Sequence, residues 1–174
     1  MTRTVREFSD LDSHGRRVTL LSADSLSEIL PLPQLTSGYY GMFLAMDARS
    51  EAASNLSDLA ACLIKRGLVY LCTWGPDCER VHDMFDWGQI DLEIASEISD
   101  EYPLMTAGHE DESLDEALWF FLNFTLPNQE YEGRCAQAFV VSVGNKEWTS
   151  YIADCLSDIP AFNGRVLFSD ETEE

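Results

Sequence analysis

Basic side chains are scarce in this sequence. Lysine and arginine together number 11 among 174 residues, whereas aspartate and glutamate number 31, so the formal net charge is −20 at pH 7. A surface this negative repels the phosphates of nucleic acids and the headgroups of anionic membranes. We therefore expect neither direct nucleic-acid binding nor membrane binding. The excess of acids favours either solubility alone or a basic protein partner.

Long apolar runs and disulfide patterns are missing as well. No apolar run approaches the ~20 residues of a membrane-spanning helix, and the N-terminal residues lack the apolar stretch of a secretory signal. The five cysteines are odd in number and form no C-x-x-C pair, which is typical of reduced thiols in a reducing compartment. We therefore expect a cytoplasmic protein. The cysteines are Cys62, Cys72, Cys78, Cys135 and Cys155.

The common catalytic and nucleotide-binding motifs are also absent. The sequence has no G-x-G-x-x-G, Walker A, H-E-x-x-H, G-x-S-x-G or EF-hand pattern. The nucleotide, protease and hydrolase chemistries that depend on these motifs are therefore unsupported. No cofactor can be named from the sequence.

Apolar segments of two kinds alternate from residue 39 onward. Continuous apolar runs at residues 39–46, 68–74, 102–107 and 138–143 indicate strands that are buried on both faces. The segments between them place apolar residues at the spacing of one helix face. This alternation predicts an α/β fold, in which a mostly parallel sheet of four or five strands is flanked by helices in three layers. The arrangement is Rossmann-like but lacks the dinucleotide-binding fingerprint.

The chain divides into three parts of different character. Residues 1–38 are predicted to be an irregular N-terminal extension packed on the domain, residues 39–168 the α/β domain, and residues 169–174 an acidic tail. Within the extension, residues 17–22 favour a short strand and residues 25–28 favour a short capped helix.

Three segments of the domain carry more specific predictions. Residues 87–101 fit both strand alternation and helical spacing, and we interpret them as a short strand followed by an irregular segment. Residues 166–168 favour a last short strand. Ser113 and Glu116 form a capping box that opens a helix over residues 114–124. This helix is apolar nearly all round, so it packs against several neighbours or against another subunit of a homo-oligomer.

The acidic residues are concentrated in one part of the chain. Residues 77–116 contain 14 of the 31 acids and a single base, Arg80, which gives a local net charge of −13. We expect Arg80 to bridge Asp77 and Asp83, or alternatively to anchor a carboxylate of a ligand.

Three turns at the carboxyl ends of predicted strands are expected to converge at one edge of the sheet, where open α/β folds bind ligands. Two of these turns run into helix N-termini, which attract anions, yet both are crowded with carboxylates. This conflict favours a cation, a metal ion or a basic side chain of a partner over a phosphate. The candidate ligand-binding or partner-binding residues are Asp47, Trp74, Asp77, Glu79, Arg80, Asp83 and Asp111.

Four residues of the same turns are candidates for catalysis. Cys78 and His82 share one helix face, so they can act as metal ligands or as a nucleophile and its base, or else both pack in the core. His109 with Glu112 or Asp111, and His82 with Asp83, can pair as a base and its orienting carboxylate. Alternatively, Asp111 and Glu112 only favour the start of the following helix.

Two stretches of the sequence resemble a known family. Residues 74–83 read WGPDCERVHD and residues 109–122 read HEDESLDEALWFFL. Both are similar to a family of uncharacterised bacterial proteins, a domain of unknown function, and so are residues 143–145 followed by Trp148. The resemblance covers roughly residues 68–156. It implies a bacterial, cytosolic protein and does not imply an activity.

Three functions remain open at this point, and whether the chain is an enzyme is open with them. The charge asymmetry favours a binding protein that engages a basic protein partner, as inhibitor or immunity proteins do. The alternative is an enzyme, or a small-ligand or metal binder, with a site around residues 77–82 and 109–113. The third is a subunit of a homo-oligomer.

Overall fold

The fold is built around one six-stranded sheet. The computed structural model describes residues 3–99, 101 and 103–169. The strands are β1 (Thr4–Leu11), β2 (Arg17–Ala23), β3 (Tyr39–Ala45), β4 (Leu68–Trp74), β5 (Met105–His109) and β6 (Cys135–Val143), in the order β1-β2-β6-β3-β4-β5. Only the β1–β2 pair is antiparallel, and the other neighbours are parallel. The predicted α/β class with a mostly parallel sheet is confirmed.

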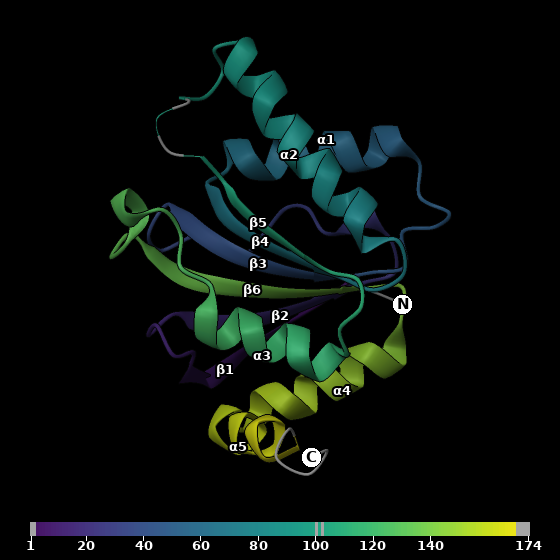
Figure 1. Ribbon diagram of the computed structural model, residues 1–174, viewed down its shortest axis with the longest axis vertical. Helices are drawn as coiled ribbons and strands as arrows, with labels where there is room; N and C mark the ends of the chain where they lie inside the picture. The colour runs from purple at the N-terminus through teal and green to yellow at the C-terminus, as the bar shows by residue number, and fades with distance from the viewer. Residues whose placement is uncertain (1–2, 100, 102, 170–174) are drawn as a thin grey trace.

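Helices cover both faces of the sheet (Figure 1). One face carries α1 (Ala53–Lys65) and α2 (Cys78–Ile94), and the other carries α3 (Leu114–Phe124), α4 (Lys146–Ser157) and α5 (Ile159–Ser169). Short 3-10 turns occur at Leu26–Glu28 and Gln129–Tyr131. Among the described residues, no helix is both long and apolar enough to cross a membrane.

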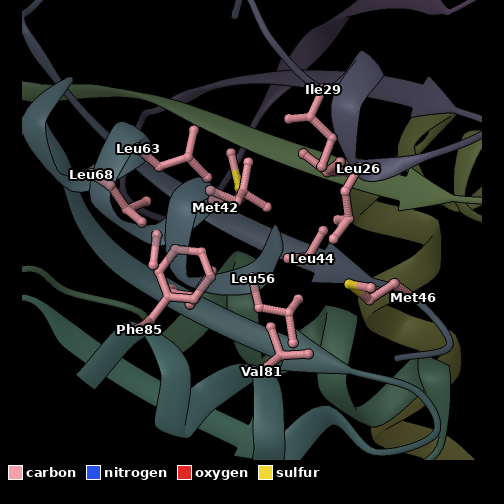
Figure 2. Close-up of a cluster of buried hydrophobic side chains, with 14 of the residues drawn as sticks. Leu26, Ile29, Met42, Leu44, Met46, Leu56, Leu63, Leu68, Val81 and Phe85 are labelled. Carbon is pink, nitrogen blue, oxygen red and sulfur yellow. The ribbon is translucent and has the colours of Figure 1, made fainter. Parts of the chain in front are cut away.

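Each face of the sheet has its own apolar core. Met42 and Leu44 of β3 point into the core under α1 and α2, whereas Phe43 and Ala45 of the same strand point into the core under α3, α4 and α5. Figure 2 shows the first core, where side chains of α1 and α2 pack over β3. Because both faces are covered, the central strands are apolar at most positions rather than only at alternate ones.

The N-terminal part of the chain is more regular than predicted. Residues 4–11 and 17–23 form the β1–β2 hairpin, which extends the sheet, so the expectation of an irregular extension is wrong for these residues. The strand over residues 17–22 is confirmed, but β1 was missed because Phe8 is its only buried residue. Residues 25–28 form a 3-10 turn without a side-chain cap from Ser25.

The short strand predicted within residues 87–101 does not form, whereas the irregular segment expected after it is observed over residues 95–99. Helix α2 continues to Ile94, because Phe85, Gly88 and Leu92 keep a helical spacing against the core. The alternation that suggested a strand comes from Ile90, Leu92 and Ile94, and two of these three side chains are exposed. Residue 100 lies outside the described residues.

Two further strand boundaries differ from the prediction. Residues 166–168 belong to helix α5, so no strand forms there. The third core strand was predicted over residues 102–107 but runs from Met105 to His109, and Tyr102 lies outside the described residues. His109 is therefore the last residue of a strand rather than part of the turn.

Candidate functional site

The loops that follow β3 and β4 are joined at the carboxyl edge of the sheet. The backbone N–H of Met46 donates to the carbonyl of Trp74 at 3.0 Å, and that of Ala48 donates to the carbonyl of Pro76 at 2.9 Å. Gly75 adopts a φ of +110°, and a Cβ atom there would lie 2.4 Å from the Met46 carbonyl oxygen. Only glycine permits this close approach. The two turns therefore form one rigid platform.

Arg80 braces this platform. Its Nε donates to Oδ2 of Asp77 at 2.7 Å, and its Nη atoms donate to the carbonyls of Glu51 and Ala48. The predicted bridge to Asp77 is observed, whereas Asp83 contacts His82 instead. With its donors directed at Asp77 and at two carbonyls of the neighbouring loop, Arg80 holds the start of α2 against that loop.

Asp47 and Arg49 neutralise each other at the surface. Arg49 donates from Nε to Oδ1 of Asp47 at 2.9 Å and from Nη2 to Oδ2 at 2.5 Å. These hydrogen bonds from Arg49 lower the pKa of Asp47 to about 2. Because the two charges are opposite, the pair contributes little net charge to the edge of the sheet, and because it is exposed it contributes little to stability.

Cys78 and His82 differ in their surroundings. Cys78 is fully buried at the start of α2, and burial raises the pKa of its thiol, against a backbone hydrogen bond from His109. His82 is half-buried, with Nδ1 3.3 Å from Asp83 Oδ1 and Nε2 3.8 Å from Asp86 Oδ2. No group of three or more His, Cys, Asp or Glu side chains in the described part of the chain can hold a metal ion. Burial and a raised pKa make Cys78 a poor nucleophile.

The structure brings together the predicted pair His109 and Glu112, as it does His82 and Asp83. His109 is buried, and its Nδ1 lies 2.8 Å from Oε2 of Glu112. Its Nε2 atom has no hydrogen-bond partner among the described residues. Its ring lies 5.0 Å from the ring of Phe120, which sequence reasoning did not select. Trp74 donates from Nε1 to the carbonyl of Glu112, and this bond fixes the turn after β5.

Six carboxylates surround the end of β5, and we call them the acidic rim. They come from one side of α2 and from the turn after β5, and none has a Lys or Arg ion-pair partner among residues 3–99, 101 and 103–169. Two contacts place carboxylates of α2 against β5. Thr106 of β5 donates to Asp86 at 2.8 Å, and the carboxylate of Glu79 lies over Gly108. The acidic rim consists of Glu79, Asp83, Asp86, Glu110, Asp111 and Glu112.

Large apolar side chains are exposed beside the acidic rim. On the outer face of α2, Trp87 is 59% exposed, Ile90 43% and Ile94 78%, and we call these three residues the α2 stripe. Met105 of β5 and Phe124 of α3 are exposed as well, by 42% and 57%. Sequence reasoning missed the α2 stripe because its residues were assigned to a strand. Their spacing of three and four residues is that of one helix face, and it could have identified the α2 stripe from the sequence.

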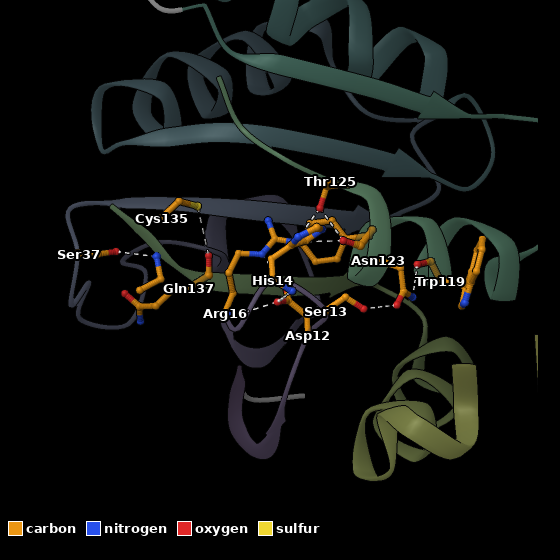
Figure 3. A network of polar contacts seen from close by, with 12 residues as sticks. Asp12, Ser13, His14, Arg16, Ser37, Trp119, Asn123, Thr125, Cys135 and Gln137 are labelled. Atoms are coloured by element: carbon orange, nitrogen blue, oxygen red, sulfur yellow. Dashed lines mark hydrogen bonds and ion pairs between the residues drawn. The ribbon is translucent and has the colours of Figure 1, made fainter. Parts of the chain in front are cut away.

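A second polar cluster lies at the opposite end of the sheet (Figure 3). Arg16 is buried and pairs with Asp12 at 2.5 Å, and it also donates to the hydroxyl of Thr125 and the carbonyl of Phe121. Its Nη1 atom has no hydrogen-bond partner in the described residues. These bonds join the β1–β2 hairpin to the end of α3. Arg16 was not selected from the sequence, because two of its partners, Phe121 and Thr125, are more than 100 residues away.

Comparison with known proteins gives a family but no activity. No curated protein matches the chain. The sequence model of the family described as "Domain of unknown function (DUF7684)" matches residues 18–159, from β2 to the first residue of α5. The matched region contains the joined loops, the acidic rim and the α2 stripe. The match covers most of the 174 residues, and the chain therefore belongs to this family of domains of unknown function.

Proposed function

We propose that this protein is a binding protein whose acidic rim and α2 stripe engage a basic protein partner, in the manner of an inhibitor or immunity protein. The observation that carries the proposal is the position of the acidic rim. Six carboxylates without a Lys or Arg partner in the described residues lie next to exposed aromatic and aliphatic side chains.

This combination fits a protein interface for two physical reasons. Carboxylates that no cation neutralises repel one another, and a basic partner relieves that repulsion and is steered toward the surface. Exposed aromatic side chains such as Trp87 are enriched among the residues that contribute most to binding energy. The partner is therefore expected to present Lys or Arg side chains around an apolar centre.

The proposal includes a bacterial cytoplasm as the location. The family resemblance supports the bacterial origin. The five free cysteines support a reducing compartment, because disulfides persist mainly in oxidising ones.

The alternative function is an enzyme or small-ligand binder, and the His109–Glu112 pair is the observation that favours it. A buried histidine oriented by a carboxylate has the arrangement of a general base. The neighbouring candidate residues support an enzyme less well. Cys78 is buried, and Arg80 is paired with Asp77 within the fold. Native mass spectrometry separates the two functions. A bound basic protein supports the first, and a retained small molecule supports the second.

The acidic rim can be tested with matched charge variants. Asp83→Asn, Glu110→Gln and Asp111→Asn together remove three rim charges, and Glu7→Gln, Asp58→Asn and Asp154→Asn together remove three exposed charges from β1, α1 and α4. Each triple variant therefore has a net charge of −17 instead of −20. We expect the rim variant to associate with the co-purified basic partner about tenfold more slowly, with a weaker dependence on salt.

The control variant should bind as the wild type does, since its charges lie on other elements. Association rates are measured at several NaCl concentrations. Equal rates for the two triple variants, or an affinity that does not change with salt, would show that the acidic rim is not the binding surface.

A further inference from the structure

Strand β5 is an open edge of the sheet. The strand order places β5 at one end, where it pairs only with β4, and no other described segment pairs with its outer side (Figure 1). An edge strand presents unpaired backbone N–H and C=O groups, which can pair with another extended chain. Its register with β4 runs without a shift from Met105 to His109.

The two edges of the sheet are protected to different degrees. Strand β1, at the other edge, has a register shift between Glu7 and Leu11 and carries charged side chains along its length. Irregular pairing and charged residues are the usual features that discourage edge-to-edge pairing. The sequence of β5, Met-Thr-Ala-Gly-His, contains no proline, lysine or arginine. Of the two edges, β5 is therefore the one open to strand addition.

The two faces of β5 have different chemistry. Thr106 and Gly108 point toward α2, where they contact the carboxylates of Asp86 and Glu79. Ala107 packs against the second core, and His109 contacts the ring of Phe120. Phe120 stacks on Phe124 at 6.0 Å between ring centroids. One side of β5 is therefore acidic and the other is apolar.

We propose that an extended basic segment of the partner adds to the sheet as a seventh strand beside β5. Side chains of an added strand alternate between the two faces. Its Lys or Arg side chains would lie against Glu79, Asp83 and Asp86, and its apolar side chains against Phe120 and Phe124. This inference rests on the proposed function and specifies how the partner binds.

A second copy of this chain is a poorer occupant of the same edge. Pairing β5 with β5 would bring two acidic rims together, and like charges at an interface oppose association. A basic segment neutralises the rim instead. Charge complementarity thus selects a foreign basic strand over self-association.

The test uses defined peptides and the full-length protein. The probe is a nine-residue peptide of alternating lysine and valine, and two derivatives carry N-methyl groups on either all lysine or all valine nitrogens. Because successive N–H groups of a strand point to opposite sides, only one set faces β5. We expect the parent peptide to shift the NMR signals of residues 105–109, and one methylated derivative to bind at least tenfold more weakly than the other.

Variants of the edge provide the second half of the test. Met105→Thr with Phe124→Ser removes exposed apolar side chains beside β5, and Val5→Thr with Leu11→Ser removes exposed ones from the opposite edge. The first variant should bind the parent peptide several-fold more weakly and the second should bind it normally. Thermal unfolding of both variants checks that each is folded.

The failures of the two proposals are distinguishable. If both methylated peptides bind as well as the parent, attraction by charge alone explains binding, so strand addition is wrong while the basic-partner function stands. If the unmethylated parent peptide does not bind even at millimolar concentration, the strand-addition proposal is again wrong. If methylation discriminates but the rim variants bind the co-purified partner normally, the edge site is real and the proposed partner surface is wrong.

Discussion

Single residues show which candidate groups are available to solvent and which are part of the packing. Four cysteines are buried, and Cys62 of α1 is the one that is partly exposed. Burial raises the pKa of the thiols of Cys72, Cys78, Cys135 and Cys155. A thiol reacts as its thiolate, so a buried thiol with a raised pKa is unreactive. This argues that Cys78 packs in the fold rather than attacking a substrate.

Thiol labelling tests this reading. Near pH 8, we expect one thiol of the native protein, Cys62, to react rapidly with a disulfide-exchange reagent, and all five to react in denaturant. The Cys62→Ser variant should then show no rapid phase. Rapid labelling of Cys78 in the native protein, located by peptide mass spectrometry, would instead revive it as a candidate nucleophile.

At the scale of helices and strands, the cap at the start of α3 determines the orientation of the turn that precedes it. The Ser113 hydroxyl accepts from the backbone N–H of Glu116, and the Glu116 carboxylate accepts from the backbone N–H of Ser113. This capping box, predicted from the sequence, starts α3 directly after the acidic turn of residues 110–112. It therefore fixes the orientation of the turn that carries half of the acidic rim.

Removing this cap should lower the free energy of unfolding by an amount that depends on pH. We expect Ser113→Ala to lower the free energy of unfolding by about 1 kcal/mol near neutral pH. Hydrogen bonds from Ser113 lower the pKa of Glu116 in the folded protein. The ionised Glu116 therefore contributes stability above its unfolded pKa, and this contribution is lost as the pH falls through the folded pKa. The difference between wild type and variant should shrink on acidification.

Urea unfolding at several pH values measures this effect. Ser150→Ala, at an exposed position inside α4, is the matched control and should change stability by less than about 0.5 kcal/mol. A Ser113→Ala variant as stable as wild type at neutral pH would contradict the role of the cap.

At the scale of the whole molecule, charge is distributed so that one edge of the sheet is strongly acidic. The net charge of −20 destabilises the compact state through self-repulsion, and salt screens this repulsion. We expect the Tm to rise by about 2–4 °C between about 0.05 M and about 0.5 M NaCl, which corresponds to about 1 kcal/mol for a chain of this size.

Differential scanning calorimetry of the charge variants locates the repulsion. The triple rim variant should gain less from salt than the variant neutralised on β1, α1 and α4, because the rim carboxylates cluster on α2 and the turn after β5 without a Lys or Arg ion-pair partner among the described residues. A Tm that does not depend on salt would mean that the acidic charges are too far apart to repel each other appreciably.

Local patterns were sufficient for much of the fold. The apolar runs that became β3, β4 and β6 identified a parallel sheet, since strands covered on both faces are apolar at most positions. The capping box at Ser113 set the start of α3. Patterns failed where one face of an element is exposed, as in β1 and the second half of α2, because exposed apolar residues there blur the period.

The sequence by itself determined the fold class and the concentration of acids in residues 77–116, and it placed the candidate partners Asp111 and Glu112 beside His109, since these features follow from local patterns in the chain. The structure selected Glu112 as the partner. Only the tertiary structure decided that the side of α2 bearing Asp86 faces β5 and that β5 is an open edge. It also decided that Arg16 is buried against Phe121 and Thr125. These features depend on strand order and on contacts between distant segments, which local periodicity does not encode.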